Sequence, residues 1–322
     1  RIQRNQETER WASASRDIGI YQTSRSGLLT DLPDFDLGLG LSIRPAVVGG
    51  FDDPSRNSSA SATGDLSLDM AKRLGPNLTA SVTINTDFAE TEADTRQTNL
   101  TRFPLFFPEK RAFFLEGSDT FVFGLGLSDD IRPFFSRRIG LVSGTEVPIL
   151  AGAKLSGRQG KTSLGGLFVR TREESGVAPA ASLAALRVRR NILEESSVGF
   201  IATGGDPLGR PGASTLGVDL TYQNSRFRGG KNFWLGAWGL MTRRDDLTGS
   251  REAWGLKVDL PNDLWDIAAS YRYVGDGFDP SLGFVPRPAV KAYRLSVVYA
   301  PRLEGTFIRQ MFHEFFVDYF TN

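Results

Sequence analysis

The feature that most constrains the fold is an alternation of apolar and polar residues that recurs along almost the whole chain. In segment 216–223, for example, Leu, Val and Tyr alternate strictly with Gly, Asp, Thr and Gln. Period 2 places alternate side chains on opposite faces of a β-strand. Turn-forming residues separate roughly thirteen such segments of about ten residues each. They are 35–44, 65–70, 78–85, 149–156, 164–172, 184–189, 198–203, 216–223, 233–242, 254–260, 265–273, 293–299 and 311–320.

The length of these segments favours a membrane barrel over a soluble β-sandwich, which also alternates. A tilted strand needs about ten residues to cross a bilayer, whereas sandwich strands average five or six. The polar positions mix Gly, Ser and Thr with Asp, Arg and Lys, as a wet lumen would, and Trp and Tyr lie near segment ends. No apolar run approaches the roughly 18 residues of a membrane helix. We therefore predict an all-β fold, part of a large antiparallel transmembrane β-barrel.

Composition excludes several other classes. The 322 residues carry a net charge of +1, so no basic field indicates a nucleic-acid partner. The chain has no Cys and one His, which argues against disulfides and zinc sites and suits passage through an oxidising periplasm. The segment GRQGKT at 157–162 is not a phosphate-binding loop, because Leu155 stands where the first Gly is required. No cofactor is expected.

The stretch 86–138 interrupts the alternation with dense charge and many phenylalanines. Its Arg side chains need carboxylate partners and its Phe side chains need apolar contacts, so it suits neither a lipid face nor free solution. We expect it to fold into the barrel lumen or across its mouth as a plug. Phe106, Phe107, Phe113 and Phe114 should form one apolar cluster. The predicted binding or lumen network consists of Asp87, Glu90, Glu92, Asp94, Arg102, Glu109, Lys110, Arg111, Glu116, Arg137 and Arg138.

The same stretch carries a family resemblance. The run NTDFAETEADTRQTNLTRFPLFFPEKRAFFLEG, followed by FFSRRIG, resembles the signature of an uncharacterised bacterial family. In that family the domain follows a carbohydrate-binding module of the family-9 type, and it is thought to form an outer-membrane β-barrel. The chain departs from the usual pattern at five positions, which puts local turn geometry in doubt. They are Thr86 and Thr95 (usually Pro), Ala89 (usually Gly), Glu90 (usually Gln) and Ala112 (usually Pro).

Three carboxylates leave alternative functions open. Glu90, Glu92 and Asp94 share a face if that stretch is extended, and so could hold Ca²⁺ or hydrolyse a glycosidic bond. A structural salt-bridge network is the simpler interpretation, because Arg and Lys residues nearby can neutralise them. His313 lies in an apolar-aromatic segment without a G-x-S-x-G motif, so an esterase triad is not supported. No catalytic residue is assigned.

The predicted organisation is a connector, 1–34, followed by one barrel domain, 35–322, that includes the plug 86–138. The chain lacks an initial Met and ends within a strand-like pattern, so we expect an internal piece of a longer protein with an unpaired sheet edge. The expected location is the outer membrane of a Gram-negative bacterium, with the lipid bilayer and carbohydrate as partners. The expected function is transport or surface anchoring linked to carbohydrate. The alternative is a carbohydrate hydrolase whose activity resides mainly in the absent N-terminal module.

Overall fold

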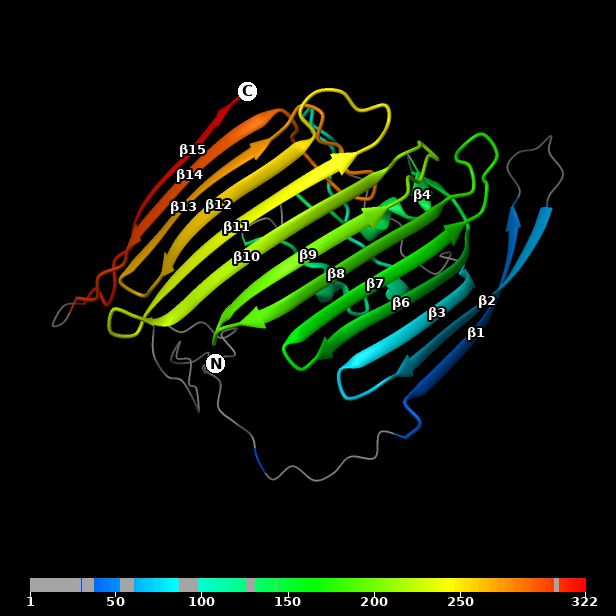
Figure 1. The fold of residues 1–322 in the computed structure, drawn as a ribbon, viewed down its shortest axis with the longest axis horizontal. Coiled ribbons are helices and arrows are strands. Elements are labelled where there is room, and N and C mark those ends of the chain that lie inside the picture. Colours follow the sequence, from blue (N-terminus) through cyan, green and yellow to red (C-terminus); the bar gives the residue numbers. More distant parts are fainter. Residues whose placement is uncertain are drawn as a thin grey trace.

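One 13-stranded antiparallel sheet dominates the computed structural model (Figure 1). The structure describes residues 30, 38–52, 61–86, 98–125, 131–142, 144–303 and 307–322. The strands follow one another in chain order, except that β3 pairs directly with β6. The strands of this sheet are β1 (Leu41–Asp52), β2 (Ser61–Arg73), β3 (Leu78–Thr86), β6 (Ile149–Gln159), β7 (Thr162–Thr171), β8 (Ser182–Ile192), β9 (Ser196–Gly204), β10 (Ser214–Phe227), β11 (Lys231–Arg243), β12 (Glu252–Pro261), β13 (Trp265–Val274), β14 (Val290–Tyr299) and β15 (His313–Thr321).

The insertion between β3 and β6 contains only short elements. They are α1 (Ala112–Leu115), the 3-10 helices η3 (Ser118–Phe121) and η4 (Ser136–Arg138), and the small hairpin of β4 (Leu141–Val142) and β5 (Thr145–Glu146). We call residues 98–125 and 131–142 the internal segment. It lies behind the sheet in Figure 1 and covers one face, which we call the inner face. No helix among the described residues is long and apolar enough to span a membrane.

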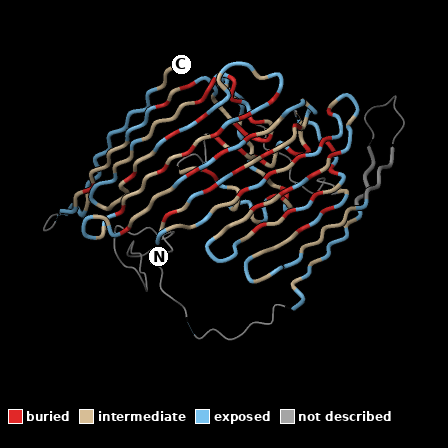
Figure 2. The backbone as a smooth tube through the Cα atoms, in the orientation of Figure 1, coloured by how far each residue is buried: buried red, intermediate tan, exposed pale blue. Residues whose placement is uncertain are grey.

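The alternation in the sequence sorts side chains between the two faces as predicted for all-β structure. Val218 is 59% exposed on the outer face, whereas its neighbour Asp219 is 7% exposed and points inward. The same alternation of buried and exposed positions runs along the central strands in Figure 2. Because the period is 2, a one-residue slip of register would exchange the two faces. The register is therefore fixed wherever the inner face is covered.

The first hairpin is longer than the sequence pattern predicts. We expected a strand at 35–44 and then a loop, but β1 continues through Gly50 and pairs with β2 out to the contact between Asp52 and Ser61. The alternation survives this extension, because Val47 and Leu66 still lie opposite one another. Residues 35–37 of the expected strand lie outside the described residues.

The described strands form an open sheet and not a closed ring. β1 and β15 stand at opposite ends of the strand order, and within the described residues neither pairs with the other. This order agrees with the expected unpaired edge. The all-β antiparallel prediction is confirmed, while a closed transmembrane barrel stays a prediction.

Glycines on the inner face allow the internal segment to lie directly on the strands. A Cβ at Gly236 of β11 would lie 2.6 Å from Leu125 Cβ, and one at Gly165 of β7 would lie 3.0 Å from the Phe121 ring. A Cβ at Gly152 of β6 would likewise lie 3.2 Å from the Phe113 ring, and one at Gly217 of β10 would lie 3.0 Å from the Phe123 ring. A side chain at any of these positions would hold the segment away from the sheet.

Two glycines of β11 test this contact, because they lie on opposite faces of one strand. Gly236→Ala places a methyl group against Leu125 and should lower the free energy of unfolding by roughly 1–3 kcal/mol. Gly239→Ala meets no atom within 4 Å and should be neutral or slightly stabilising. Equilibrium urea titration followed by tryptophan fluorescence compares the two. An equal change in unfolding free energy for the two variants would show that the internal segment does not pack directly on the glycine at 236.

Candidate functional site

A buried ion pair on the inner face anchors the internal segment to the middle of the sheet. Arg187 of β8 and Asp219 of β10 meet through two hydrogen bonds of 2.5 and 2.9 Å. They meet across β9 at Gly199, where a Cβ would come within 2.5 Å of both side chains. Gly199 therefore provides the space in which the pair forms.

This pair also satisfies backbone groups of the internal segment. Arg187 Nε donates to the Val122 carbonyl at 3.1 Å, and Asp219 accepts from the Gly124 amide at 3.3 Å. The guanidinium lies 5.1 Å from the centre of the Phe123 ring. A buried ion pair stabilises a fold only when such additional hydrogen bonds offset the desolvation of both charges. The contacts fix residues 122–124 over β8–β10.

A second cation, Lys154 of β6, holds the short helix α1. Its ammonium group donates to the Phe113 carbonyl and, at 2.6 Å, to the Glu116 carbonyl. It also lies 4.9 Å from the centre of the Phe113 ring. The last carbonyls of a helix lack partners within the helix, and a cation there is favourable. Lys154 therefore joins the end of α1 to the floor of the sheet.

Within the internal segment, Glu109 and Arg111 form a bidentate pair with both hydrogen bonds at 2.7 Å. Arg111 also donates to the Ile139 and Ser136 carbonyls, at 2.6 and 2.9 Å, and Ser136 donates its hydroxyl to Glu109 at 2.7 Å. The pair thus ties residues 109–111 to residues 136–139. Burial raises the pKa of Glu109, but the hydrogen bonds and charge of Arg111 outweigh it and hold that pKa below its ordinary value of 4.5.

The loop between β13 and β14 closes over the other side of the segment. Arg132 and Phe284 exchange two backbone hydrogen bonds of 2.8 and 2.9 Å, and Phe135 donates its amide to the Leu282 carbonyl at 2.7 Å. The rings of Phe106, Phe135 and Phe284 lie 5.4–5.7 Å apart, at tilted or edge-on angles typical of aromatic packing. This loop therefore supplies a wall to the segment.

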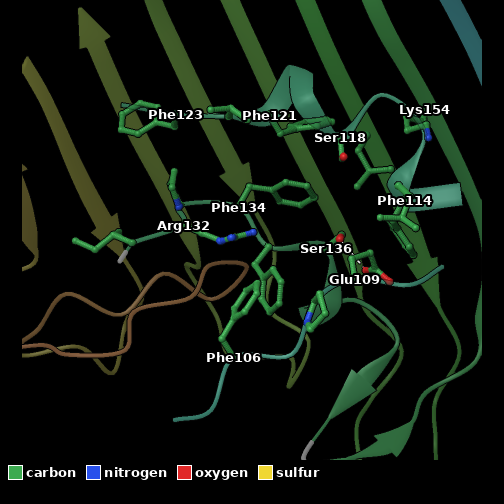
Figure 3. A pocket seen from close by; sticks show the side chains of 17 residues that line it. Phe106, Glu109, Phe114, Ser118, Phe121, Phe123, Arg132, Phe134, Ser136 and Lys154 are labelled. Carbon is green, nitrogen blue, oxygen red and sulfur yellow. Dashed lines mark hydrogen bonds between the residues drawn. The ribbon is translucent and has the colours of Figure 1, made fainter. Parts of the chain in front are cut away.

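Between these contacts lies a cavity of about 360 Å³, which we call the aromatic cavity (Figure 3). Most of its walls are apolar, with six phenylalanines contributed by the internal segment and Leu167 contributed by β7. Its charged residues are Glu109, Arg132 and Lys154. The volume falls within the range of roughly 300–1,000 Å³ that small-molecule sites occupy.

A network of charges organises the neighbouring loops. Asp206 and Arg210 of the β9–β10 loop pair at 2.7 Å, and Arg244 of the β11–β12 loop bonds Asp246 at 2.6 Å and Asp279 at 2.8 Å. Burial raises the pKa of Asp206, but hydrogen bonds from Arg210 and Ser281 outweigh it, and the net shift is downward. Arg244 also lies 4.0 Å from Asp206, so ion pairs join the β9–β10, β11–β12 and β13–β14 loops.

The predicted network residues fall into several environments. Asp87, Glu90, Glu92 and Asp94 lie outside the described residues. The Glu109–Arg111 pair is the only ion pair between members of the predicted set that is found among the described residues. The others are held differently: Arg137 donates to the Pro108 carbonyl and Arg138 to the Gly283 carbonyl, Arg102 lies 5.2 Å from the Phe103 ring centre, Glu116 offers its carbonyl to Lys154, and the Lys110 amide bonds Glu109.

The expected four-phenylalanine cluster is divided in the structure. Phe113 and Phe114 meet edge-on at 5.1 Å beside Lys154 and Arg111, whereas Phe106 packs with Phe135 and Phe284. Phe107 lies 5.7 Å from the Arg137 guanidinium. The cluster prediction is wrong because the β13–β14 loop, remote in sequence, contributes an aromatic partner.

Sequence reasoning missed the importance of Arg187 and Lys154. Both lie at polar positions of the alternating segments 149–156 and 184–189, yet neither belongs to the predicted network. The available signal was a long cation at an inward position with glycines at inward positions on adjacent strands. That combination leaves room for a side chain to bend along the sheet toward a covering segment.

Hydrolysis finds little support in the aromatic cavity. Glycoside hydrolysis uses two carboxylates, one of them a general acid with a raised pKa. Among the described residues, Glu109 is the one acid that lines the cavity, and its pKa is lowered. No group of three His, Cys, Asp or Glu residues is placed to hold a metal in the part of the chain that the structure describes. The proposed calcium carboxylates lie outside that part.

The pKa of Glu109 generates a pH prediction. A lowered pKa stabilises the fold above the ordinary value of 4.5, and this contribution is lost as the pH falls through the lower folded-state pKa. Glu109→Gln should therefore flatten the loss of stability below about pH 4.5 and cost on the order of 3–5 kcal/mol at pH 7, because Arg111 stays buried without its counter-charge. Urea titrations from pH 3 to 7 measure both effects.

Glu194→Gln is the matched control, because its pair with Arg226 leaves the two side chains 75% and 63% exposed. Such a surface pair should contribute at most about 1 kcal/mol. An acid profile for Glu109→Gln that parallels the wild-type profile would show that Glu109 is not ionised against Arg111.

Comparison with known proteins identifies part of the chain. Residues 39–164 match the protein-family model described as Domain of unknown function (DUF5916). The matched range contains β1, β2, β3, β6 and the internal segment. No curated protein matched the chain, and no solved structure did. Residues 39–164 are thus similar to an uncharacterised domain, and the carbohydrate-binding neighbour stays a prediction.

Proposed function

We propose that this chain forms the wall of an outer-membrane β-barrel whose interior is occluded by the internal segment. The observation that carries the proposal is the chemistry of the outer face. Every one of the thirteen strands of the sheet carries at least one exposed large apolar side chain. Representative residues are Ile43, Leu66, Val82, Phe168, Leu186, Phe200, Val218, Met241, Leu256, Tyr293 and Phe315.

Such a surface has a high cost in water. Monomeric soluble proteins rarely expose contiguous apolar patches larger than a few hundred Å², and this one crosses the whole sheet. In a bilayer the same face is solvated by lipid, while the polar and charged residues point to the interior. The strands are 9 to 14 residues long, enough for a tilted strand to cross the hydrocarbon core.

Aromatic residues on the outer face support the same environment. The rings of Trp265 and Tyr299 lie 4.4 Å apart in a tilted arrangement at one end of β13 and β14, and His313 lies 6.0 Å from Tyr299. Toward the opposite end of the strands, Trp254 packs against Tyr273, with ring centres 6.2 Å apart. Amphipathic rings at both ends of membrane strands form the girdles of outer-membrane barrels.

The connections indicate an orientation. At one end of the strands the turns are short: 74–77, 160–161, 193–195, 228–230 and 262–264, with 300–312 as a longer exception. At the other end the loops 172–181, 205–213, 244–251 and 275–289 are longer. Outer-membrane barrels have short periplasmic turns and longer extracellular loops. In this proposal the charged loop network and the β13–β14 loop therefore face the cell exterior.

An occluded interior favours gated transport or surface anchoring over a general pore. The internal segment is attached through buried charges on β6, β8 and β10, and each such attachment is costly to break singly. We include a link to carbohydrate uptake or tethering in the proposal, and its only support is the family resemblance of the sequence.

Site-directed labelling tests the membrane environment directly, because the chain has no Cys. Val218→Cys, carrying an environment-sensitive fluorophore in lipid vesicles, should show blue-shifted emission and quenching by lipid-bound nitroxides. Leu208→Cys is the control, since Leu208 is also exposed, at 44%, but lies in the β9–β10 loop beyond the strands. A water-like spectrum at both positions would exclude the proposed lipid face.

Conductance tests the occlusion. Arg111→Ala should loosen residues 109–111 from residues 136–139, lowering the melting temperature and raising single-channel conductance in planar bilayers. Arg226→Ala, which removes an exposed pair, should leave both quantities near wild type. Unchanged melting together with unchanged conductance for Arg111→Ala would mean that the segment does not close the interior. Swelling of vesicles in sugar solutions then distinguishes transport from anchoring.

A further inference from the structure

The aromatic cavity has an unbalanced positive charge. Glu109 is the only carboxylate among its described lining residues, and it is already bound by Arg111 and Ser136. Of the two cations of the lining, Lys154 has the Glu116 carboxylate as a nearby opposite charge, whereas Arg132 makes no ion pair within the described chain. Arg132 therefore presents a positive charge to the cavity that no described carboxylate neutralises.

Arg132 is the cation available to a ligand. Its backbone is fixed by the two hydrogen bonds with Phe284, and its guanidinium lies 4.4 Å from the centre of the Phe106 ring. In the part of the chain that the structure describes, that guanidinium makes ring contacts but no hydrogen bond or ion pair. Figure 3 shows the side chain between Phe134 and Phe106. A guanidinium presents a planar set of donors that matches a carboxylate.

Lys154 has a different role. Its ammonium donors are engaged by the Phe113 and Glu116 carbonyls. It contributes positive potential at the cavity floor without being free to rotate toward a ligand. In an apolar environment a charge acts more strongly than in water, so an anion gains chiefly from Arg132, and a cation would be repelled by it.

The phenylalanine walls of the aromatic cavity indicate which kind of apolar group a ligand should carry. Phe121 and Phe134 meet at 4.9 Å, and Phe106 and Phe135 at 5.4 Å, all with tilted rings. Aromatic rings pack favourably in offset or edge-on arrangements, with a gain beyond the area that they bury. A flat aromatic body can make such contacts with several walls at once, whereas an alkyl chain gains only the burial of its surface.

We propose that the aromatic cavity binds a small aromatic monoanion, with its carboxylate on Arg132 and its ring system among the phenylalanines. The site depends on the packing of the internal segment and not on the membrane location of the sheet. Binding can therefore fail while the lipid-face labelling succeeds, and the reverse can also occur.

Isothermal titration calorimetry with 2-naphthoate at pH 7 tests the site, using the full chain in neutral detergent and subtracting a micelle blank. We expect saturable binding with one ligand per chain. The neutral 2-naphthylmethanol and the cationic 2-naphthylmethylammonium should bind at least about tenfold more weakly, because a hydrogen-bonded charge contributes roughly that much. Octanoate, with an alkyl body, should also bind more weakly.

Two substitutions locate the ligand. Arg132→Gln should weaken 2-naphthoate at least about tenfold, while Arg132→Lys should weaken it less because the charge remains. Arg158→Gln is the control, since Arg158 donates to the Gly160 carbonyl at the β6–β7 turn, away from the cavity, and it should bind like wild type. Melting curves confirm that each variant is folded.

Several results would overturn the proposal. They are an absence of saturable binding, equal affinity for the anion and the ammonium analogue, and equal affinity for octanoate. A folded Arg132→Gln variant with wild-type affinity would also overturn it. If Arg132→Gln fails to fold, the ligand series on the wild-type chain still decides the charge and the aromatic character of the site.

Discussion

The position of the internal segment depends on the buried pair of Arg187 and Asp219. Two charges on the inner face are expensive to desolvate, and their mutual attraction alone offsets little of that cost. The balance changes because the Val122 carbonyl and the Gly124 amide complete the hydrogen bonding of the pair. Segment and pair therefore need one another: without the segment the charges lose partners, and without the charges two backbone groups are left unsatisfied over the sheet.

The two faces of the sheet place opposite demands on one strand. On β10, Val218 is exposed and Asp219 is buried, although they are adjacent in sequence. The inner face needs small residues where the aromatic side chains of the internal segment pack on it. It needs long cationic side chains where carbonyl groups of that segment require hydrogen-bond donors. In the proposed membrane setting, the outer face needs a continuous apolar surface. Period 2 satisfies both sets of demands at once, which is why the alternation persists through strands whose inner neighbours differ widely.

Much of the sheet could be predicted from the sequence, because its signal is local. The alternation in 216–223 identifies both the strand and the direction of Asp219, and antiparallel order follows from short turns between consecutive segments. The Glu109–Arg111 pair was also within reach, since the two residues are close in the chain. The extension of β1 to Asp52 is not predicted from the sequence, because Pro45, Gly49 and Gly50 are residues typical of turns and their partners in β2 are not evident from the sequence alone.

The candidate site could not be predicted in the same way, because its contacts join distant parts of the chain. One half of the internal segment, 113–125, is held by sheet residues through Lys154, Arg187 and inner-face glycines. The other half, 131–138, is held by the β13–β14 loop through backbone hydrogen bonds with Leu282 and Phe284 and through the Arg138 side chain, which donates to the Gly283 carbonyl. The aromatic cavity lies between these halves, so part of its wall is held by the sheet and part by the β13–β14 loop. A ligand bound at Arg132 would therefore contact the half that the loop holds, through a residue whose backbone is paired with Phe284, while its other contacts lie on the half that Lys154 and Arg187 hold.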